Sequence, residues 1–163
     1  MKKTNHIHSA KRTLDVESKA LTKLAANLDQ KFSNLCEVIL RSKGKIITLG
    51  VGKSGHIAQK ISATLSSTGS PSYFIHATEA LHGDIGIISK NDSVLILSHS
   101  GESKEIIDLI PSLKNIGCKI FSFTGPTEST IAKSTDINIS TEVDKEACPL
   151  NLAPTSSTTA ALA

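Results

Sequence analysis

The sequence predicts an α/β protein: a three-layer α/β/α sandwich with a five-stranded parallel sheet, preceded by N-terminal helices. Five short β-rich runs alternate with helical segments, and this alternation implies right-handed βαβ crossovers. The run "SVLIL" (93–97) is apolar throughout, as expected of a central strand covered on both faces. At 163 residues, the chain is long enough for one domain with a sizeable core.

The chain opens with a predicted N-terminal helical arm, residues 1–43. Leucines at helical spacing (Leu14, Leu21, Leu24 and Leu28) predict a first helix over 9–29. A stripe of apolar side chains predicts a second helix over roughly 31–42. The arm carries more leucine than a single crossover helix needs.

The alternating elements occupy residues 44–163, the predicted second domain. The predicted strands are 45–50, 72–75, 93–98, 119–124 and 137–140. The predicted helices between them are 55–68, 103–116 and 128–134. The last stretch, "APTSSTTAALA" (153–163), opens a helix and stops without a C-cap, so we expect this helix to be incomplete.

Composition narrows the class of protein and its partners. The net charge is +3, and the lysines of the arm are scattered among acidic residues, which favours a solvated helix face over a nucleic-acid patch. The three cysteines show no CxxC spacing, a pattern typical of a reducing compartment rather than of a disulfide framework. No apolar run approaches ~18 residues. We therefore expect a cytoplasmic protein that binds neither nucleic acid nor a membrane.

The stretch "GVGKSG" (50–55) follows the first predicted strand and is similar to two phosphate motifs. A nucleotide-triphosphate P-loop would place its first glycine at Ile47, inside the strand, so the loop is too short to wrap a triphosphate. A dinucleotide fingerprint expects an acidic residue at the end of the second strand, which here ends at His76. What remains is Lys53 at the start of a helix, where an ammonium favours an anion, or else an exposed lysine on a glycine turn.

The loop "SHSGESKE" (98–105) follows the most apolar strand. Ser98, Ser100 and Ser103 surround Gly101, which lets the backbone turn through positive φ. Hydroxyls and free N–H groups at the start of the next helix predict a cup for one phosphate. An ordinary N-cap is the alternative, but it would need only one serine.

Four stretches together resemble a known family: "GVGKSG", "SSTGSPSYFIHATEALHGDIG", "SHSGESKEI" and "KEACPLNLAPTSSTT". They are similar to the sugar isomerase (SIS) domain of D-arabinose 5-phosphate isomerases, from about Leu14 to Ala163. The resemblance implies a flavodoxin-like SIS fold and an enzyme that interconverts D-ribulose 5-phosphate and D-arabinose 5-phosphate for Kdo and lipopolysaccharide biosynthesis. Full-length members of the family usually continue into paired CBS domains, and this sequence ends before them.

The resemblance also implies roles for particular residues. Lys53, Glu105 and Glu146 match positions of catalytic importance, and His82 matches a substrate contact that is a candidate acid or base. Aldose–ketose isomerisation needs a proton carrier and a group that stabilises the developing oxyanion. We assign a carboxylate to the first role and Lys53 to the second, with either glutamate as the base. Beside the three serines, the implied substrate contacts are Gly69, Ser70, His76, His82, Glu142, Val143 and Asp144.

The reaction requires no metal or organic cofactor in principle. The resemblance implies an inhibitory zinc at His76, although no second ligand at a suitable spacing accompanies it. It further implies a phosphopentose substrate, a homodimer or homotetramer whose sites are completed by neighbouring subunits, and another catalytic histidine in a downstream segment that this sequence does not contain. Two alternatives remain: a non-catalytic SIS module that senses a phosphosugar, and an NAD-dependent dehydrogenase.

Overall fold

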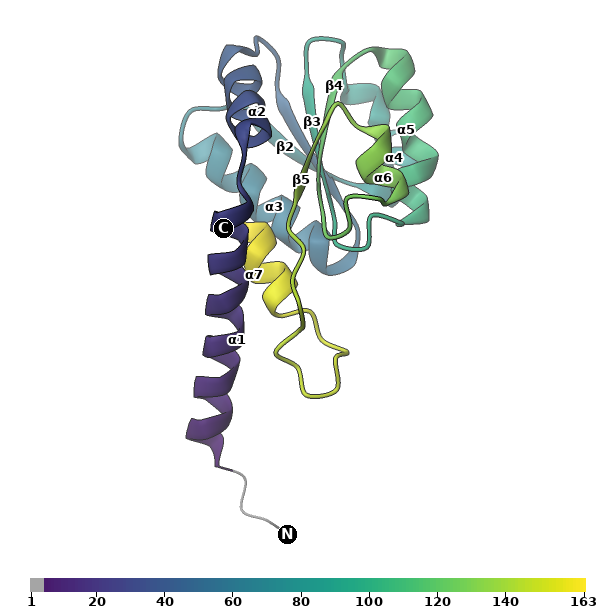
Figure 1. The fold of residues 1–163 in the computed structure, drawn as a ribbon. Coiled ribbons are helices and arrows are strands. Elements are labelled where there is room, and N and C mark those ends of the chain that lie inside the picture. The colour runs from purple at the N-terminus through teal and green to yellow at the C-terminus, as the bar shows by residue number, and fades with distance from the viewer. Residues whose placement is uncertain (1–4) are drawn as a thin grey trace.

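The computed structural model describes residues 5–163, and its five strands form one parallel sheet in the order β2-β1-β3-β4-β5 (Figure 1). The strands are β1 (Ile46–Gly50), β2 (Ser72–His76), β3 (Ser93–Ser98), β4 (Lys119–Thr124) and β5 (Ile137–Ser140). In the central pairing, Leu49 of β1 lies opposite Ile75 of β2 on one side and Ile96 of β3 on the other. The predicted strands and their parallel arrangement are confirmed.

Helices precede, connect and follow the strands. They are α1 (His6–Asn27), α2 (Gln30–Arg41), α3 (Gly52–Ser67), α4 (Ala77–Leu81), α5 (Lys104–Ile116), α6 (Thr130–Ser134) and α7 (Ser156–Leu162), with a 3-10 helix at Asp84–Ile87. The sequence pattern did not predict α4 or the 3-10 helix, which have only five and four residues. Within residues 5–163, no helix combines the length and the apolar character that crossing a membrane requires.

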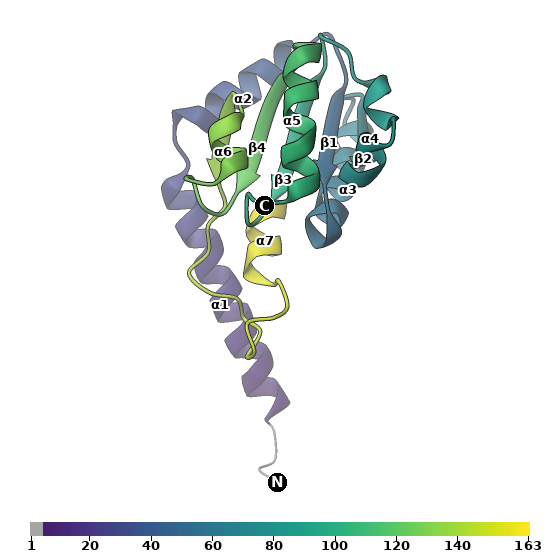
Figure 2. The same cartoon turned by 90° about the vertical axis from the view of Figure 1, so that its right-hand side faces the viewer.

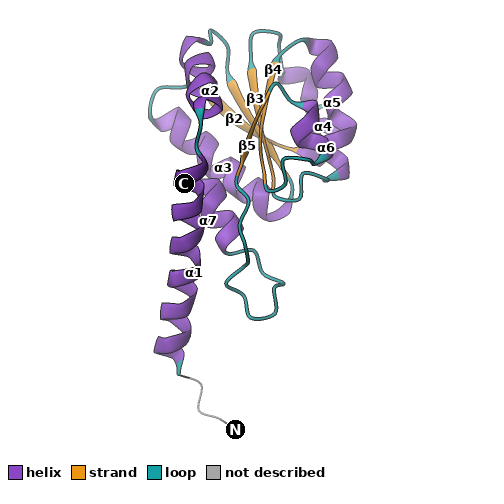
Figure 3. Ribbon diagram, in the orientation of Figure 1, coloured by secondary structure: helices purple, strands orange, loops and turns teal. Residues whose placement is uncertain are grey.

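Two hydrophobic clusters pack against the opposite faces of the sheet. On one face, α4 and α5 cover the sheet, with Ile106 of α5 packed in the same cluster as Leu49 of β1. On the other face, Leu35 of α2 and Ala58 of α3 pack in one cluster with Leu97 of β3. Figure 2 looks onto the face with α5 and α6, and Figure 3 shows the strands between the two helical layers. The predicted three-layer sandwich is therefore confirmed, and α2 is part of it.

Helix α1 extends beyond the sandwich and lies along α7 (Figure 1). Its buried side chains are Val16 and Ala20, whereas Leu14 is 65% exposed and Ile7 is 70% exposed. Polar bonds also fix the helix, since Arg12 Nη2 donates to the Ala147 carbonyl at 2.8 Å. In the single chain, α1 therefore exposes apolar side chains along a helix that is otherwise held in place.

Candidate functional site

The sheet order places a crevice at the carboxyl ends of β1 and β3. The two strands are parallel, but the chain continues from β1 to β2 on one side and from β3 to β4 on the other. The loops that follow β1 and β3 therefore leave toward opposite faces of the sheet. Ligands of open α/β sheets bind at such a point. A pocket of about 170 Å³ lies there. Its polar lining residues come from four segments: Lys53 and Ser54, Ser98 and His99, Thr141, and Ser157 and Thr158. We call it the switch-point pocket.

The glycines of "GVGKSG" have a structural reason that requires no nucleotide. A Cβ on Gly50 would lie 2.9 Å from the Gly55 Cα, and a Cβ on Gly55 would lie 3.2 Å from the Gly50 carbonyl oxygen. The two glycines therefore let the first turn of α3 pack directly on the end of β1. This close approach brings Lys53, an exposed residue in the first turn of α3, to the wall of the switch-point pocket.

The serine loop is held against the start of α6. Gly101 has a φ of +66°, and a Cβ there would clash with the Ser129 side chain, so only glycine fits. The Ile131 N–H donates to the Gly101 carbonyl at 3.0 Å, and the Glu102 carboxylate accepts the Thr130 N–H at 2.7 Å. Hydrogen bonds from Thr130 lower the pKa of the Glu102 carboxyl. Glu102, which the sequence pattern did not single out, is thus a positioning residue for this loop.

The three serines of the loop occupy different environments. Ser98 is buried, and its Oγ lies 2.9 Å from Ser103 Oγ. Ser100 is exposed, and its Oγ accepts the Glu102 N–H at 3.2 Å. Ser103 is the N-cap residue of α5, yet its side chain makes no capping hydrogen bond. The serines therefore do not serve as an ordinary side-chain cap, and of the three only Ser98 lines the switch-point pocket.

A second pocket, of about 410 Å³, shares His99 with the first. The chain after β5 supplies its other lining residues, among them Val143, Asp144 and Glu146. Asp144 also pairs with Lys23 of α1, with 2.6 Å between the charged atoms. His99, to which the sequence pattern assigned no catalytic role, thus lies on the wall between two pockets that together contain five of the predicted site residues.

The Glu146 carboxylate is engaged by the start of α7. Its Oε2 accepts the Thr155 N–H at 2.7 Å, the Thr155 hydroxyl at 3.0 Å and the Ser157 N–H at 3.3 Å. Burial by itself raises the pKa of the Glu146 carboxyl, but the hydrogen bonds from Ser157 and Thr155 outweigh it, and the net shift is downward.

The other predicted site residues line neither pocket. Glu105 is half-buried in the first turn of α5, and His82 is exposed at the end of α4. Gly69 and Ser70 precede β2, so they lie at the amino-terminal edge of the sheet, opposite the switch-point pocket. Glu142 is exposed next to β5. None of them lines either pocket, and their roles stay predictions.

His76, the predicted zinc ligand, is half-buried, and its Nδ1 accepts the Thr78 N–H at 3.3 Å. Nowhere in residues 5–163 do three or more His, Cys, Asp or Glu side chains group closely enough to hold a metal ion. The inhibitory zinc at His76 therefore stays a prediction.

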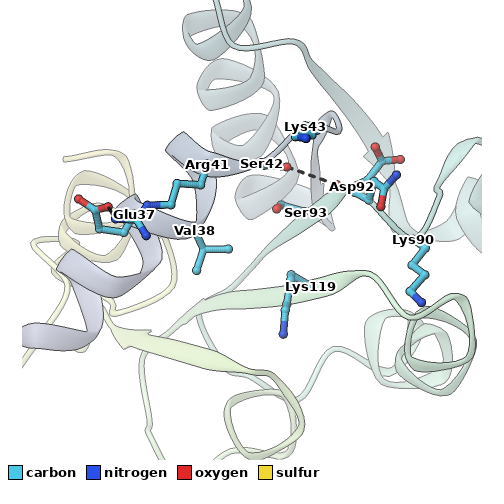
Figure 4. Close-up of a pocket in the computed structure, with 10 residues that line it drawn as sticks. Glu37, Val38, Arg41, Ser42, Lys43, Lys90, Asp92, Ser93 and Lys119 are labelled. Carbon is cyan, nitrogen blue, oxygen red and sulfur yellow. Dashed lines mark hydrogen bonds and ion pairs between the residues drawn. The ribbon is translucent and has the colours of Figure 1, made fainter.

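A larger pocket, of about 450 Å³, lies at the opposite, amino-terminal edge of the sheet (Figure 4). Lys43, Lys90 and Lys119 line it, and Figure 4 shows them on different sides of the cavity rather than converging on one point. Asp92, also on its wall, is buried and forms hydrogen bonds within the fold. Because its charged groups do not converge, size alone does not make this cavity the functional site.

Several polar residues of the switch-point pocket were not predicted as site residues from the sequence, among them Ser157 and Thr158 on the first turn of α7. The signal was present, because the polar run "TSSTT" follows the last strand at the same edge of the sheet as the other site loops. What the pattern did not show is the set of tertiary contacts of α7, with Glu146 and with α1 and α3, that accompany its position at the pocket.

The fold is a flavodoxin-like sandwich with a small, lysine-bearing pocket at its switch point, the place where open α/β sheets bind their ligands. The chain belongs to the SIS domain family, whose match covers residues 39–163. This finding confirms the family resemblance drawn from the sequence.

Similar proteins carry the name arabinose 5-phosphate isomerase KdsD. The one from Pseudomonas aeruginosa is 51% identical over 156 residues, covering 96% of this chain and 48% of that protein. The one from Francisella tularensis is 47% identical over 162 residues, covering 98% of this chain and 50% of that protein. A solved structure, an Escherichia coli CFT073 protein in complex with arabinose 5-phosphate, superposes with a TM-score of 0.94 at 43% identity, covering 99% of this chain and 86% of that one. The chain thus spans about half the length of the curated relatives it matches.

Proposed function

We propose that this chain is the isomerase domain of an aldose–ketose isomerase that interconverts D-ribulose 5-phosphate and D-arabinose 5-phosphate. The observation that carries the proposal is the switch-point pocket, in which Lys53 and the Ser98 hydroxyl line one small cavity. At about 170 Å³ the cavity is below the usual size range for drug-sized ligands, which favours a small sugar phosphate over a dinucleotide. The names of the relatives and the arabinose 5-phosphate complex of the solved structure support the same substrate.

In the proposed reaction a proton moves between C1 and C2 through a cis-enediol, and a second proton moves between the two oxygens. The Lys53 ammonium stabilises the negative charge that develops on the enediolate oxygen. The substrate phosphate binds at the serine loop, where the N-terminus of α5 and the hydroxyls favour an anion. Glu105, in the first turn of the adjacent helix, is a candidate proton carrier. Each of these steps uses side chains of the protein.

An assay with ribulose 5-phosphate tests the proposal on this chain and on a chain continued to the length of the relatives. Formation of arabinose 5-phosphate by either chain supports it. Tight binding of arabinose 5-phosphate without turnover by either chain would instead indicate a phosphosugar-sensing module. Saturable quenching in a nicotinamide fluorescence titration would indicate the dehydrogenase alternative.

The phosphate role of the serine loop predicts a change in KM. Ser98→Ala and Ser100→Ala should each raise the KM for arabinose 5-phosphate by roughly tenfold or more, because a hydrogen bond to a charged acceptor contributes about 1.5–3 kcal/mol. Steady-state kinetics measure the effect, with the exposed Ser112→Ala on α5 as a matched control. An unchanged KM in both loop variants would contradict the phosphate assignment.

We also propose that the chain assembles into a homodimer or a homotetramer built on two dimers. The exposed apolar residues of α1 support this, as do Gly69 and Ser70, which one chain holds at the edge of the sheet opposite the pocket. Light scattering at micromolar concentration is expected to give a mass of two or four chains. A monomer with full isomerase activity would contradict both the assembly and the idea that subunits complete one another's sites.

The cellular setting completes the proposal: a cytoplasmic enzyme that needs no cofactor and supplies Kdo synthesis for lipopolysaccharide. The three cysteines are all free thiols in the structure, which fits a reducing compartment. Fractionation of the native cell, with isomerase activity followed in each fraction, tests the location.

A further inference from the structure

Glu146 has the geometry of an anchor for α7. All three hydrogen bonds to its side chain reach the same oxygen, Oε2, and they come from Thr155 and Ser157 at the start of that helix. Thr155 Oγ1 in turn accepts the Ala147 N–H at 2.7 Å, which ties the residue after Glu146 to the same point. The carboxylate therefore joins the chain that follows β5 to the first turn of α7.

This anchor lies beside one wall of the switch-point pocket, which is formed by α7, a helix that also packs against α1 and α3. Ser157, Thr158 and Ala161 of α7 line the same pocket as Lys53. Helix α7 has seven residues, too few to hold its position by helix propensity alone, so tertiary contacts must fix it. The Glu146 contacts lie at its first turn, directly beside the residues that line the pocket.

The same contacts make Glu146 a poor proton carrier. A general base works best when its pKa lies near the operating pH, whereas the hydrogen bonds to Glu146 hold its pKa below the ordinary value of a glutamate. Three donors are already directed at Oε2, so a proton could be taken up only at Oε1. Glu105, by contrast, accepts no side-chain hydrogen bond in the part of the chain that the structure describes.

We propose that Glu146 is a positioning residue that sets the pocket wall through α7, and that the proton carrier of the isomerisation is another group. The inference rests on the proposed isomerase function. It resolves the choice between the two glutamates that the sequence left open, in favour of Glu105.

Replacement by glutamine separates the two roles. Glu146→Gln keeps a carbonyl oxygen that can accept the same three bonds, whereas Glu146→Ala removes them all. If Glu146 positions α7, the glutamine variant keeps kcat/KM within about tenfold of the parent, and the alanine variant loses about 10²-fold, as a misplaced pocket wall would cause. If Glu146 carries the proton, both variants lose about 10²–10⁴-fold. Glu37→Gln and Glu37→Ala, on an exposed glutamate of α2 at the opposite edge of the sheet, are the matched controls.

Two readouts without turnover complete the experiment. Hydrogen exchange of the α7 amides should accelerate at least about tenfold in Glu146→Ala and stay near the parent rate in Glu146→Gln. The affinity for arabinose 5-phosphate, measured by calorimetry, should fall in Glu146→Ala, where exchange accelerates, and should stay near the parent value in Glu146→Gln. An inactive Glu146→Gln variant with parent-like exchange would overturn the inference, and so would unchanged exchange in Glu146→Ala. If the parent protein itself fails to isomerise while exchange and binding follow the expected pattern, the proposed function fails and the anchor stands.

Discussion

Lys53→Ala is expected to lower kcat by about 10²-fold or more, with a smaller change in KM. Removing one preorganised group that stabilises an oxyanion typically costs this much, because the charge it stabilises develops only in the transition state. The fold should survive, since Lys53 is exposed on the first turn of α3 and forms no ion pair with any residue in 5–163. Steady-state kinetics together with a thermal unfolding curve measure both effects.

Two companion variants make the Lys53 result interpretable. Lys53→Arg keeps the charge but changes its shape, so partial recovery of kcat is expected. Lys60→Ala, on the exposed part of the same helix, should leave kcat unchanged. A rise in KM alone in Lys53→Ala would make the residue a phosphate clamp instead of a group that stabilises the enediolate.

The long elements of the fold could be predicted because their sequence periods are complete. β3 is apolar at nearly every position and is buried throughout, and the apolar side chains of α5 recur on its buried face. α4 could not be predicted, since it follows β2 without a loop and its cap is His76, a residue that is not typical of that position. Helix α6, which is equally short, has the typical cap residue Ser129 and was predicted. The start of α3 was placed three residues late, because Gly52 and Gly55 suggest a turn until the packing of Gly55 against β1 is known.

The residues of the candidate site that lie at or directly after the end of a strand could be predicted from the sequence. Lys53 and Ser98 each come shortly after or at the end of a strand, so sheet topology alone brings them to one edge. The part that α7 contributes was not predictable, because its place at the pocket depends on tertiary contacts with Glu146, α1 and α3 that the local sequence pattern does not show. For Gly69 and Ser70 the prediction rests on the family resemblance, which makes them substrate contacts. A single chain holds both residues at the amino-terminal edge of the sheet, opposite the switch-point pocket.

Asp92 supports the sheet at the edge opposite the switch-point pocket. Among the variants proposed here, its loss should cause the largest fall in the free energy of unfolding. Its side chain is 1% exposed. Oδ1 accepts the Lys45 N–H at 2.8 Å, and Oδ2 accepts the Ser89 N–H at 2.8 Å and its hydroxyl at 2.9 Å, with the Lys45 ammonium 3.0 Å away. These bonds join the starts of β1 and β3, the same two strands whose other ends flank the switch-point pocket.

Asp92→Ala is therefore expected to lower the free energy of unfolding by about 3–5 kcal/mol, because it removes a buried carboxylate and leaves two part-buried backbone donors and one partly buried ammonium without a partner. Urea unfolding at neutral pH measures the change. Asp15→Ala, which removes an exposed pair with Lys19, should change the free energy of unfolding by less than about 1 kcal/mol.

Burial raises the pKa of the Asp92 carboxyl, but hydrogen bonds from Lys45 and Ser89 outweigh it and lower the pKa overall. The stabilisation is then fully present above the unfolded-state pKa near about 4 and is lost as pH falls through the lower folded-state value. The difference in unfolding free energy between the parent and Asp92→Ala should accordingly shrink below about pH 4. A difference that stays constant down to about pH 2 would show that the ionised carboxylate is not the source of the stability.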